Sequence, residues 1–189
     1  MVSPLRIALS LGLLGLCVLF RQSLEADPVM HVLVQLPVLA FSGALFVAGL
    51  GARHLRVTEP LANALSLVAV LAILFWMLPR YIDATLVNPV IEFAKFVSIP
   101  VFVGGSLALG WEKSHPFLCG FLKANAISML GVLSFLYIHA PVRICNSYLF
   151  ADQERLGFGF LISAVSLGIA WAIPLFFPPP KELHFQSSQ

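Results

Sequence analysis

The feature of this sequence that most constrains its fold is a series of long apolar segments. A helix that crosses about 30 Å of hydrocarbon needs about 20 mostly apolar residues. The segments that meet this requirement run over about Pro4–Phe20, Val29–Leu50, Pro60–Leu78, Pro89–Trp111, Phe117–Ile138 and Leu156–Phe177. Strands of a membrane β-barrel would alternate in polarity over about ten residues, whereas these segments are continuously apolar. We therefore predict an all-α bundle of about six transmembrane helices joined by short loops.

The composition favours a membrane protein over a soluble one. Hydrophobic residues make up 59% of the 189 residues and charged residues only 11%, against about a quarter in a soluble domain. Such a chain cannot cover a soluble surface with charge, which excludes a cytosolic enzyme and a disordered protein. The net charge of +2 is too small for binding to a nucleic-acid backbone. We expect one transmembrane domain over residues 1–177, a short polar tail over 178–189, contact with membrane lipid, and a membrane-protein partner or a second copy of the chain.

Prolines are predicted to shape these helices. Pro37, Pro100 and Pro174 lie inside the second, fourth and sixth spans, where each should kink its helix and free a backbone carbonyl. Asn88, directly before Pro89, is a predicted N-cap of the fourth span.

Basic residues in the short loops predict the orientation, because Lys and Arg favour the cytoplasmic side of a membrane. The side that holds both termini carries Arg6, Arg53, Arg56, Lys113 and Lys181, and the other side carries Arg21, Arg80, Arg143 and Arg155. We expect a multi-pass protein of a bacterial inner membrane with both termini in the cytoplasm. We interpret the first span as an uncleaved signal anchor.

Alternation of the spans also collects most of the chemically interesting side chains at one end of the bundle, which is the periplasmic face in this orientation. They are Met30, His31, Gln35, Met77, Asp83, His139, Arg143, Cys145, Asp152 and Gln153. The longest loop on this side is expected to extend from His139 to Gln153.

Thiolate, thioether and imidazole groups in this set are the ligand types that select Cu(I). We predict His31 and Cys145 as the principal metal ligands, with Met30 and Met77 as soft partners. Arg143 would lower the pKa of the Cys145 thiol and favour its thiolate. The alternatives are an interfacial His31 that bonds to water or a carbonyl, and a structural thiol at Cys145.

Other polar residues on this side are predicted to orient the ligands through hydrogen bonds. Gln35 shares a helix face with His31, while Asp152, Gln153 and Asp83 come from neighbouring segments. Asp152 could instead cap the last helix, and Asp83 could pair with Arg80. Glu92 and Lys95, three residues apart, are predicted to form a salt bridge or to snorkel to the membrane surface.

Two short stretches resemble a known family. Met30–Leu39, with the sequence MHVLVQLPVL, resembles the HMxxH…aPpLL motif of the CtaG family, membrane proteins associated with cytochrome c oxidase assembly and copper supply. Asp152–Gly157, with the sequence DQERLG, resembles the DQxxGG motif that opens a late span in that family. Gln35 replaces the second histidine of the first motif. In the other motif the second glycine is displaced, because Gly157 is followed by Phe158 and then by Gly159. The resemblance implies a multi-span membrane protein that handles copper.

The sequence thus predicts a copper chaperone rather than an enzyme. It would hold Cu(I) at the periplasmic face and pass it to a respiratory or other copper enzyme during assembly. One alternative is a membrane redox protein that binds haem or quinone, with His139 and His31 as paired axial ligands. Another is a structural subunit of a larger membrane complex.

Overall fold

The computed structural model describes residues 2–52, 55–141, 145 and 147–176, and these residues are mostly helical, with no strand among them. The elements are α1 (Pro4–Leu19), α2 (Arg21–Ala26), η1 (Met30–Gln35), α3 (Leu36–Gly49), α4 (Glu59–Trp76), α5 (Pro79–Val87), α6 (Pro89–Ser98), η3 (Ile99–Gly105), α7 (Ser106–Gly110), η4 (Trp111–Lys113), α8 (Pro116–His139) and α9 (Phe150–Phe176). The predicted all-α architecture is confirmed.

Helical stretches that are long and apolar enough to cross a membrane number five in the described chain. They are Met30–Gly49, Glu59–Trp76, Pro89–Lys113, Pro116–His139 and Phe150–Pro174. The first predicted span is an apolar helix of 16 residues, α1. Its length falls short of the roughly 20 residues that a perpendicular crossing requires.

The predicted loops are more helical than the sequence pattern indicates. α9 begins at Phe150 rather than near Leu156, so the last four residues of the expected loop belong to its first turns. Short helices α2 and α5 fill segments that were expected to be irregular. The hydropathy pattern missed them because they are too short and too polar to resemble a span. The predicted tail over 178–189 lies outside the described residues.

Two of the three mid-span prolines lie at π-helical segments. η1 ends directly before Leu36 and Pro37, and η3 contains Pro100. A proline has no N–H for the carbonyl four residues earlier, and a π-bulge is one way in which a helix accommodates this loss. Pro174 lies within α9, which continues to Phe176.

Glycines allow two of the helices to touch through their backbones. At Gly43 on α3, an added Cβ would lie 1.9 Å from the carbonyl oxygen of Pro100. At Gly104 on η3, it would lie 1.9 Å from the carbonyl oxygen of Ala40. Close crossings at small residues are typical of helix pairs in membranes. This crossing fixes the position of α6, which precedes η3, relative to η1, which precedes α3.

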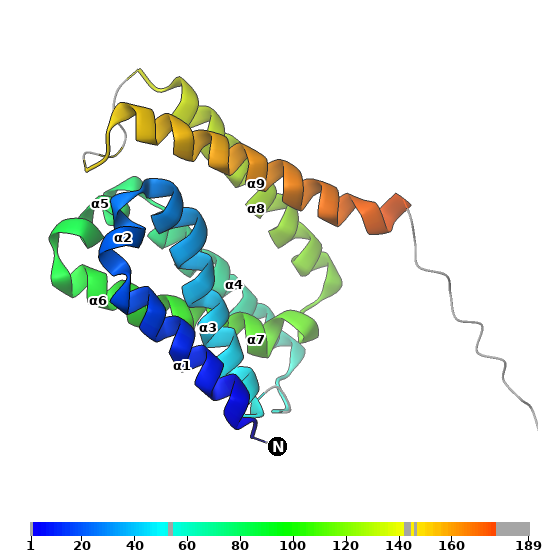
Figure 1. The fold of residues 1–189 in the computed structure, drawn as a ribbon. Coiled ribbons are helices and arrows are strands. Elements are labelled where there is room, and N and C mark those ends of the chain that lie inside the picture. The colour runs from blue at the N-terminus through cyan, green and yellow to red at the C-terminus, as the bar shows by residue number, and fades with distance from the viewer. Residues whose placement is uncertain (1, 53–54, 142–144, 146, 177–189) are drawn as a thin grey trace, which may run out of the picture.

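The helices divide into a bundle and a hairpin (Figure 1). The bundle contains α1 to α7, and α8 and α9 pack against each other as an antiparallel pair along its side. We call the end of the molecule that carries α2, the start of α6 and the α8–α9 connection the polar end. The opposite end carries the start of α1, η4 and the start of α8.

Candidate functional site: a buried charge centre

Lys95 is the centre of a polar cluster inside the polar end. Its side chain comes from α6 and is only 1% exposed. The ammonium lies 2.5 Å from Glu25 Oε1, 3.0 Å from Gln35 Oε1 and 3.1 Å from His31 Nε2. A lysine ammonium has three N–H donors, so each donor has one acceptor here.

Glu25 supplies the negative charge that compensates for this buried ammonium. The Glu25 side chain is 10% exposed. Its Oε1 also accepts a hydrogen bond of 3.2 Å from Gln35 Nε2. An uncompensated ammonium in an apolar interior would cost several kcal/mol. The compensation of the Lys95 charge therefore depends on α2, because this helix brings the carboxylate of Glu25 to α6, which carries Lys95.

His31 joins Lys95 to Tyr148 in the connection between α8 and α9. The Tyr148 hydroxyl donates to the backbone carbonyl of Glu25 at 2.8 Å, so its oxygen is left to accept from His31 Nδ1 at 3.0 Å. The other ring nitrogen, Nε2, accepts from Lys95. These bonds assign a neutral imidazole with its proton on Nδ1. We call Glu25, His31, Gln35, Lys95 and Tyr148 the Lys95 centre.

Helix caps hold the segments of the Lys95 centre in place. Asp27 Oδ1 accepts from the backbone N–H of Val29 at 2.8 Å and starts the helical run that carries His31. Asn88 Oδ1 accepts from the N–H of Val90 at 2.9 Å, which confirms the predicted N-cap of α6. His31 and Gln35 are four residues apart in η1, so they lie about one helical turn apart, and both are buried.

Further ion pairs surround the centre at the polar end. Arg21 donates through one nitrogen to both carboxylate oxygens of Glu92 at 2.9 Å. Arg155 on α9 lies 3.1 Å from Asp27 and 3.5 Å from Asp152. The pair of Arg155 and Asp27 connects α9 of the hairpin to the bundle near Tyr148.

The predicted relation between Glu92 and Lys95 is wrong. Glu92 pairs with Arg21, and Lys95 is buried against Glu25 instead of reaching the membrane surface. Spacing along one helix identifies only partners on that helix. The partner of Lys95 comes instead from α2, which brings the carboxylate of Glu25 to the buried side of α6.

Cys145 also lies at the polar end, where it contacts Tyr137, which is not a member of the Lys95 centre. It is 3% exposed, and its Sγ lies 3.5 Å from the hydroxyl of Tyr137. Burial raises the pKa of the Cys145 thiol above its ordinary value, against the lowering expected from a nearby guanidinium. Arg143 lies outside the described residues. Gln153, predicted to orient a ligand, donates from Nε2 to the backbone carbonyl of Tyr137 at 3.3 Å.

The predicted thioether ligands lie in different environments. Met30 is 47% exposed, whereas Met77 packs against the buried core cluster that contains Cys17 and Cys145. His139 stacks on Phe135 of its own helix with ring centroids 4.5 Å apart, and its Nδ1 lies 3.0 Å from the carbonyl oxygen of that residue.

The two predicted carboxylates bond near the α8–α9 connection. Asp83 Oδ1 accepts from the backbone N–H of Ser147 at 3.3 Å, and Asp152 pairs with Arg155. Within the described ranges, no group of three or more His, Cys, Asp or Glu side chains is arranged to hold a metal ion. His31 and Gln35 do come together, but they do so around Lys95.

Sequence reasoning missed Glu25, Lys95 and Tyr148 as members of the site. Lys95 carried a usable signal, because a charged residue several positions inside a membrane span marks a functional site by default. Glu25 and Tyr148 carried none, since they lie in polar segments where a carboxylate or a hydroxyl is ordinary. Their role follows only from the way that four separate segments meet.

Comparison of the chain with family models, with curated proteins and with solved structures gives no match.

Proposed function

We propose that this chain is a multi-span membrane protein that exchanges a proton at the Lys95 centre with the water at its polar end. The observation that carries the proposal is the ammonium of Lys95, 1% exposed and bonded to Glu25, Gln35 and His31. Ionisable residues inside apolar bundles are costly, and they commonly mark ion pathways and proton relays.

Two of the three acceptors around Lys95 are able to take its proton. The carboxylate of Glu25 and the unprotonated Nε2 of His31 are bases, whereas the amide oxygen of Gln35 only accepts a hydrogen bond. In the step toward His31, an N–H bond of Lys95 breaks and an N–H bond forms at Nε2. The imidazole then releases its Nδ1 proton, as a histidine does in a proton shuttle.

Tyr148 provides the exit for that proton. Its oxygen accepts from His31 Nδ1 and receives the released proton in this scheme. The hydroxyl proton of Tyr148, which is bonded to the backbone carbonyl of Glu25 in this structure, must then turn away from that carbonyl and leave to water at the polar end. Burial, together with the charge of Glu25, raises the pKa of the Tyr148 hydroxyl. Tyr148 therefore acts as a neutral hydroxyl relay rather than as an anion. The other titratable groups that interact electrostatically with Lys95 are Glu92 and Cys17.

Hydrogen–deuterium exchange at the Lys95 ammonium tests this proposal in the full chain reconstituted in bilayers. ¹⁵N-detected NMR would follow Lys95, assigned by its loss in Lys95→Arg. We expect fast exchange despite the burial of the ammonium, and exchange at least about tenfold slower in Tyr148→Phe and His31→Asn, which keep the Glu25–Lys95 pair. Gln35→Met is the matched control, because it removes hydrogen bonds to Lys95 and Glu25 from a side chain that cannot take up a proton. Equal or faster exchange in Tyr148→Phe would show that the cluster is a structural ion pair.

Copper handling is the second candidate function. It is favoured by the free, buried thiols of Cys17 and Cys145 in one core cluster with Met77 packed against it. Thiolate and thioether groups suit Cu(I). His31 would join such a site only by giving up its bond to Lys95. The haem alternative requires the exposed His139 and the buried His31 to face one cofactor, and His31 would have to give up its bond to Lys95 or to Tyr148.

An anaerobic Cu(I) titration separates the two functions. Copper handling predicts binding at one equivalent that is lost in Cys145→Ser and weakened in His31→Ala. Unchanged stoichiometry and affinity in both variants would exclude it. The visible spectrum of the purified protein tests haem in the same preparation, since a Soret band would be required.

A further inference from the structure

A groove between α8 and α9 lies at the end opposite to the Lys95 centre. It has a volume of about 570 Å³ and is lined chiefly by apolar residues, with Lys123 and Trp171 at its sides. Ala126 on α8 and Ala170 on α9 leave the space between the helices open. The groove lies within two of the stretches that are long and apolar enough to cross a membrane.

Lys123 adds a positive charge to this otherwise apolar groove. It is the eighth residue of α8, which places it about 10 Å from the start of the helix at a rise of 1.5 Å per residue. Its Nζ lies 5.7 Å from the centre of the Trp111 ring. In the part of the chain that the structure describes, none of the ion pairs contains Lys123. Tryptophan side chains gather at membrane–water interfaces, and a lysine inside the end of a span extends its ammonium toward that interface.

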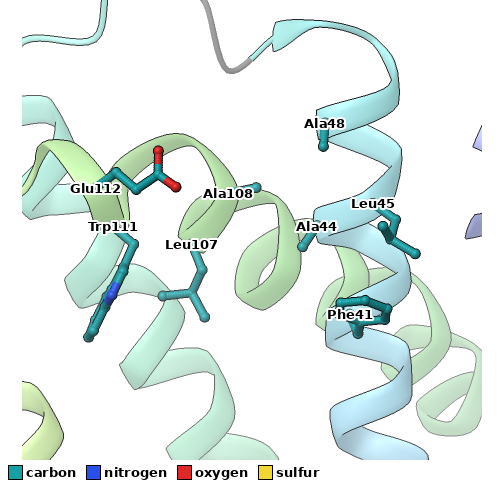
Figure 2. A pocket seen from close by; sticks show the side chains of 8 residues that line it. All are labelled: Phe41, Ala44, Leu45, Ala48, Leu107, Ala108, Trp111 and Glu112. Carbon is teal, nitrogen blue, oxygen red and sulfur yellow. The ribbon is translucent and has the colours of Figure 1, made fainter. Parts of the chain in front are cut away.

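A second apolar groove provides a contrast at the same end. Figure 2 shows it between Phe41, Ala44, Leu45 and Ala48 on α3 and the facing residues Leu107, Ala108, Trp111 and Glu112. Its volume is about 370 Å³. Glu112 is among the residues that line this groove, whereas Lys123 is among those that line the groove between α8 and α9. Of these two grooves, the α8–α9 groove therefore complements an anionic headgroup better.

We propose that the α8–α9 groove binds an anionic phospholipid. The phosphate contacts the ammonium of Lys123, and one acyl chain lies along Ala126, Ala170 and Trp171. A basic residue near the membrane surface attracts anionic lipid by about 1 kcal/mol, which corresponds to a preference of about fivefold. The site is independent of the Lys95 centre, since the two lie at opposite ends of the molecule.

Tryptophan quenching by brominated lipids tests the site in nanodiscs of phosphatidylcholine and phosphatidylglycerol. Either lipid carries bromine on its acyl chains in turn, and Trp171→Phe identifies the signal of Trp171. We expect brominated phosphatidylglycerol to quench Trp171 about fivefold more per mole than brominated phosphatidylcholine. Equal quenching by the two lipids in the unmodified protein would overturn the proposal.

Variants assign the preference to Lys123. Lys123→Gln should reduce the quenching ratio to that of the bulk lipid mixture, whereas Arg6→Gln removes a basic residue at the same end and should leave the ratio unchanged. Ala170→Leu fills the groove and should reduce quenching by both lipids. Inorganic phosphate should not compete, because it has no acyl chain. A quenching ratio that is unchanged in Lys123→Gln, or quenching that is not reduced in Ala170→Leu, would contradict the site.

Discussion

At the scale of single residues, the pair of Glu25 and Lys95 dominates the energetics of the polar end. Removal of one partner leaves the other as a buried, unpaired charge, which typically costs about 3–5 kcal/mol. We expect Glu25→Gln or Lys95→Met each to lower the free energy of unfolding by about this amount. The double variant should cost less than the sum, since no charge is then left unpaired. Unfolding in detergent micelles measures the effect, and strictly additive losses would contradict the pairing.

Cys145 allows a test of burial through pH dependence. A thiol reacts with maleimide as its thiolate, and burial raises the pKa of Cys145. In a Cys17→Ser, Cys119→Ser background, labelling of the folded protein should be slow at neutral pH. It should continue to rise about tenfold per pH unit beyond the ordinary thiol pKa of about 8.5. The unfolded protein is the control. A rate that levels off below pH 8 would show a lowered pKa, as the sequence suggested.

The sequence predicts some residues of the candidate site, but it does not predict their partners. The sequence identifies His31, Gln35 and Cys145 as candidates, because their side chains have distinctive chemistry and lie near the end of a predicted span. The partners of His31 could not be predicted, because Lys95 and Tyr148 lie 64 and 117 residues away in the sequence. A spacing rule identifies neighbours on one helix, whereas this site forms between helices.

At the scale of the elements, the crossing of α3 and η3 is the most constrained contact. Gly43→Ala would place a methyl group 1.9 Å from the carbonyl oxygen of Pro100, so the helices must separate. We expect a loss of about 1–3 kcal/mol in stability. Gly131→Ala is the matched control, because an added Cβ meets no atom within 4 Å there and alanine favours a helix. Thermal unfolding in detergent compares them, and equal melting temperatures would contradict the crossing.

The elements themselves were predictable to the extent that hydropathy determines them. The five long spans follow from continuous apolar runs, and their predicted ends lie within a few residues of the observed ones, except at the start of α9. Phe150–Arg155 looked like a loop because it is polar. Asp152 lies in the first turn of this helix, where a carboxylate is favourable.

At the scale of the whole molecule, the α8–α9 hairpin is joined to the bundle by polar contacts at the polar end. Tyr148 bonds to His31 and Glu25, and Arg155 pairs with Asp27. We expect Tyr148→Phe combined with Arg155→Gln to loosen the hairpin. Spin labels at the exposed positions Ser23 and Glu154 should then give a broader distance distribution. Arg155→Gln alone is the control, and an unchanged distribution in the double variant would exclude this role.

The arrangement of the Lys95 centre is the claim on which the proposed function depends, and the tautomer of His31 tests it most directly. ¹⁵N NMR of histidine-labelled protein in bilayers at neutral pH, assigned with His31→Asn, distinguishes the two neutral tautomers and the imidazolium. We predict a neutral ring with its proton on Nδ1 and with Nε2 hydrogen-bonded to Lys95, and a loss of that hydrogen bond in Lys95→Met. A proton on Nε2, or a charged ring, would contradict the account.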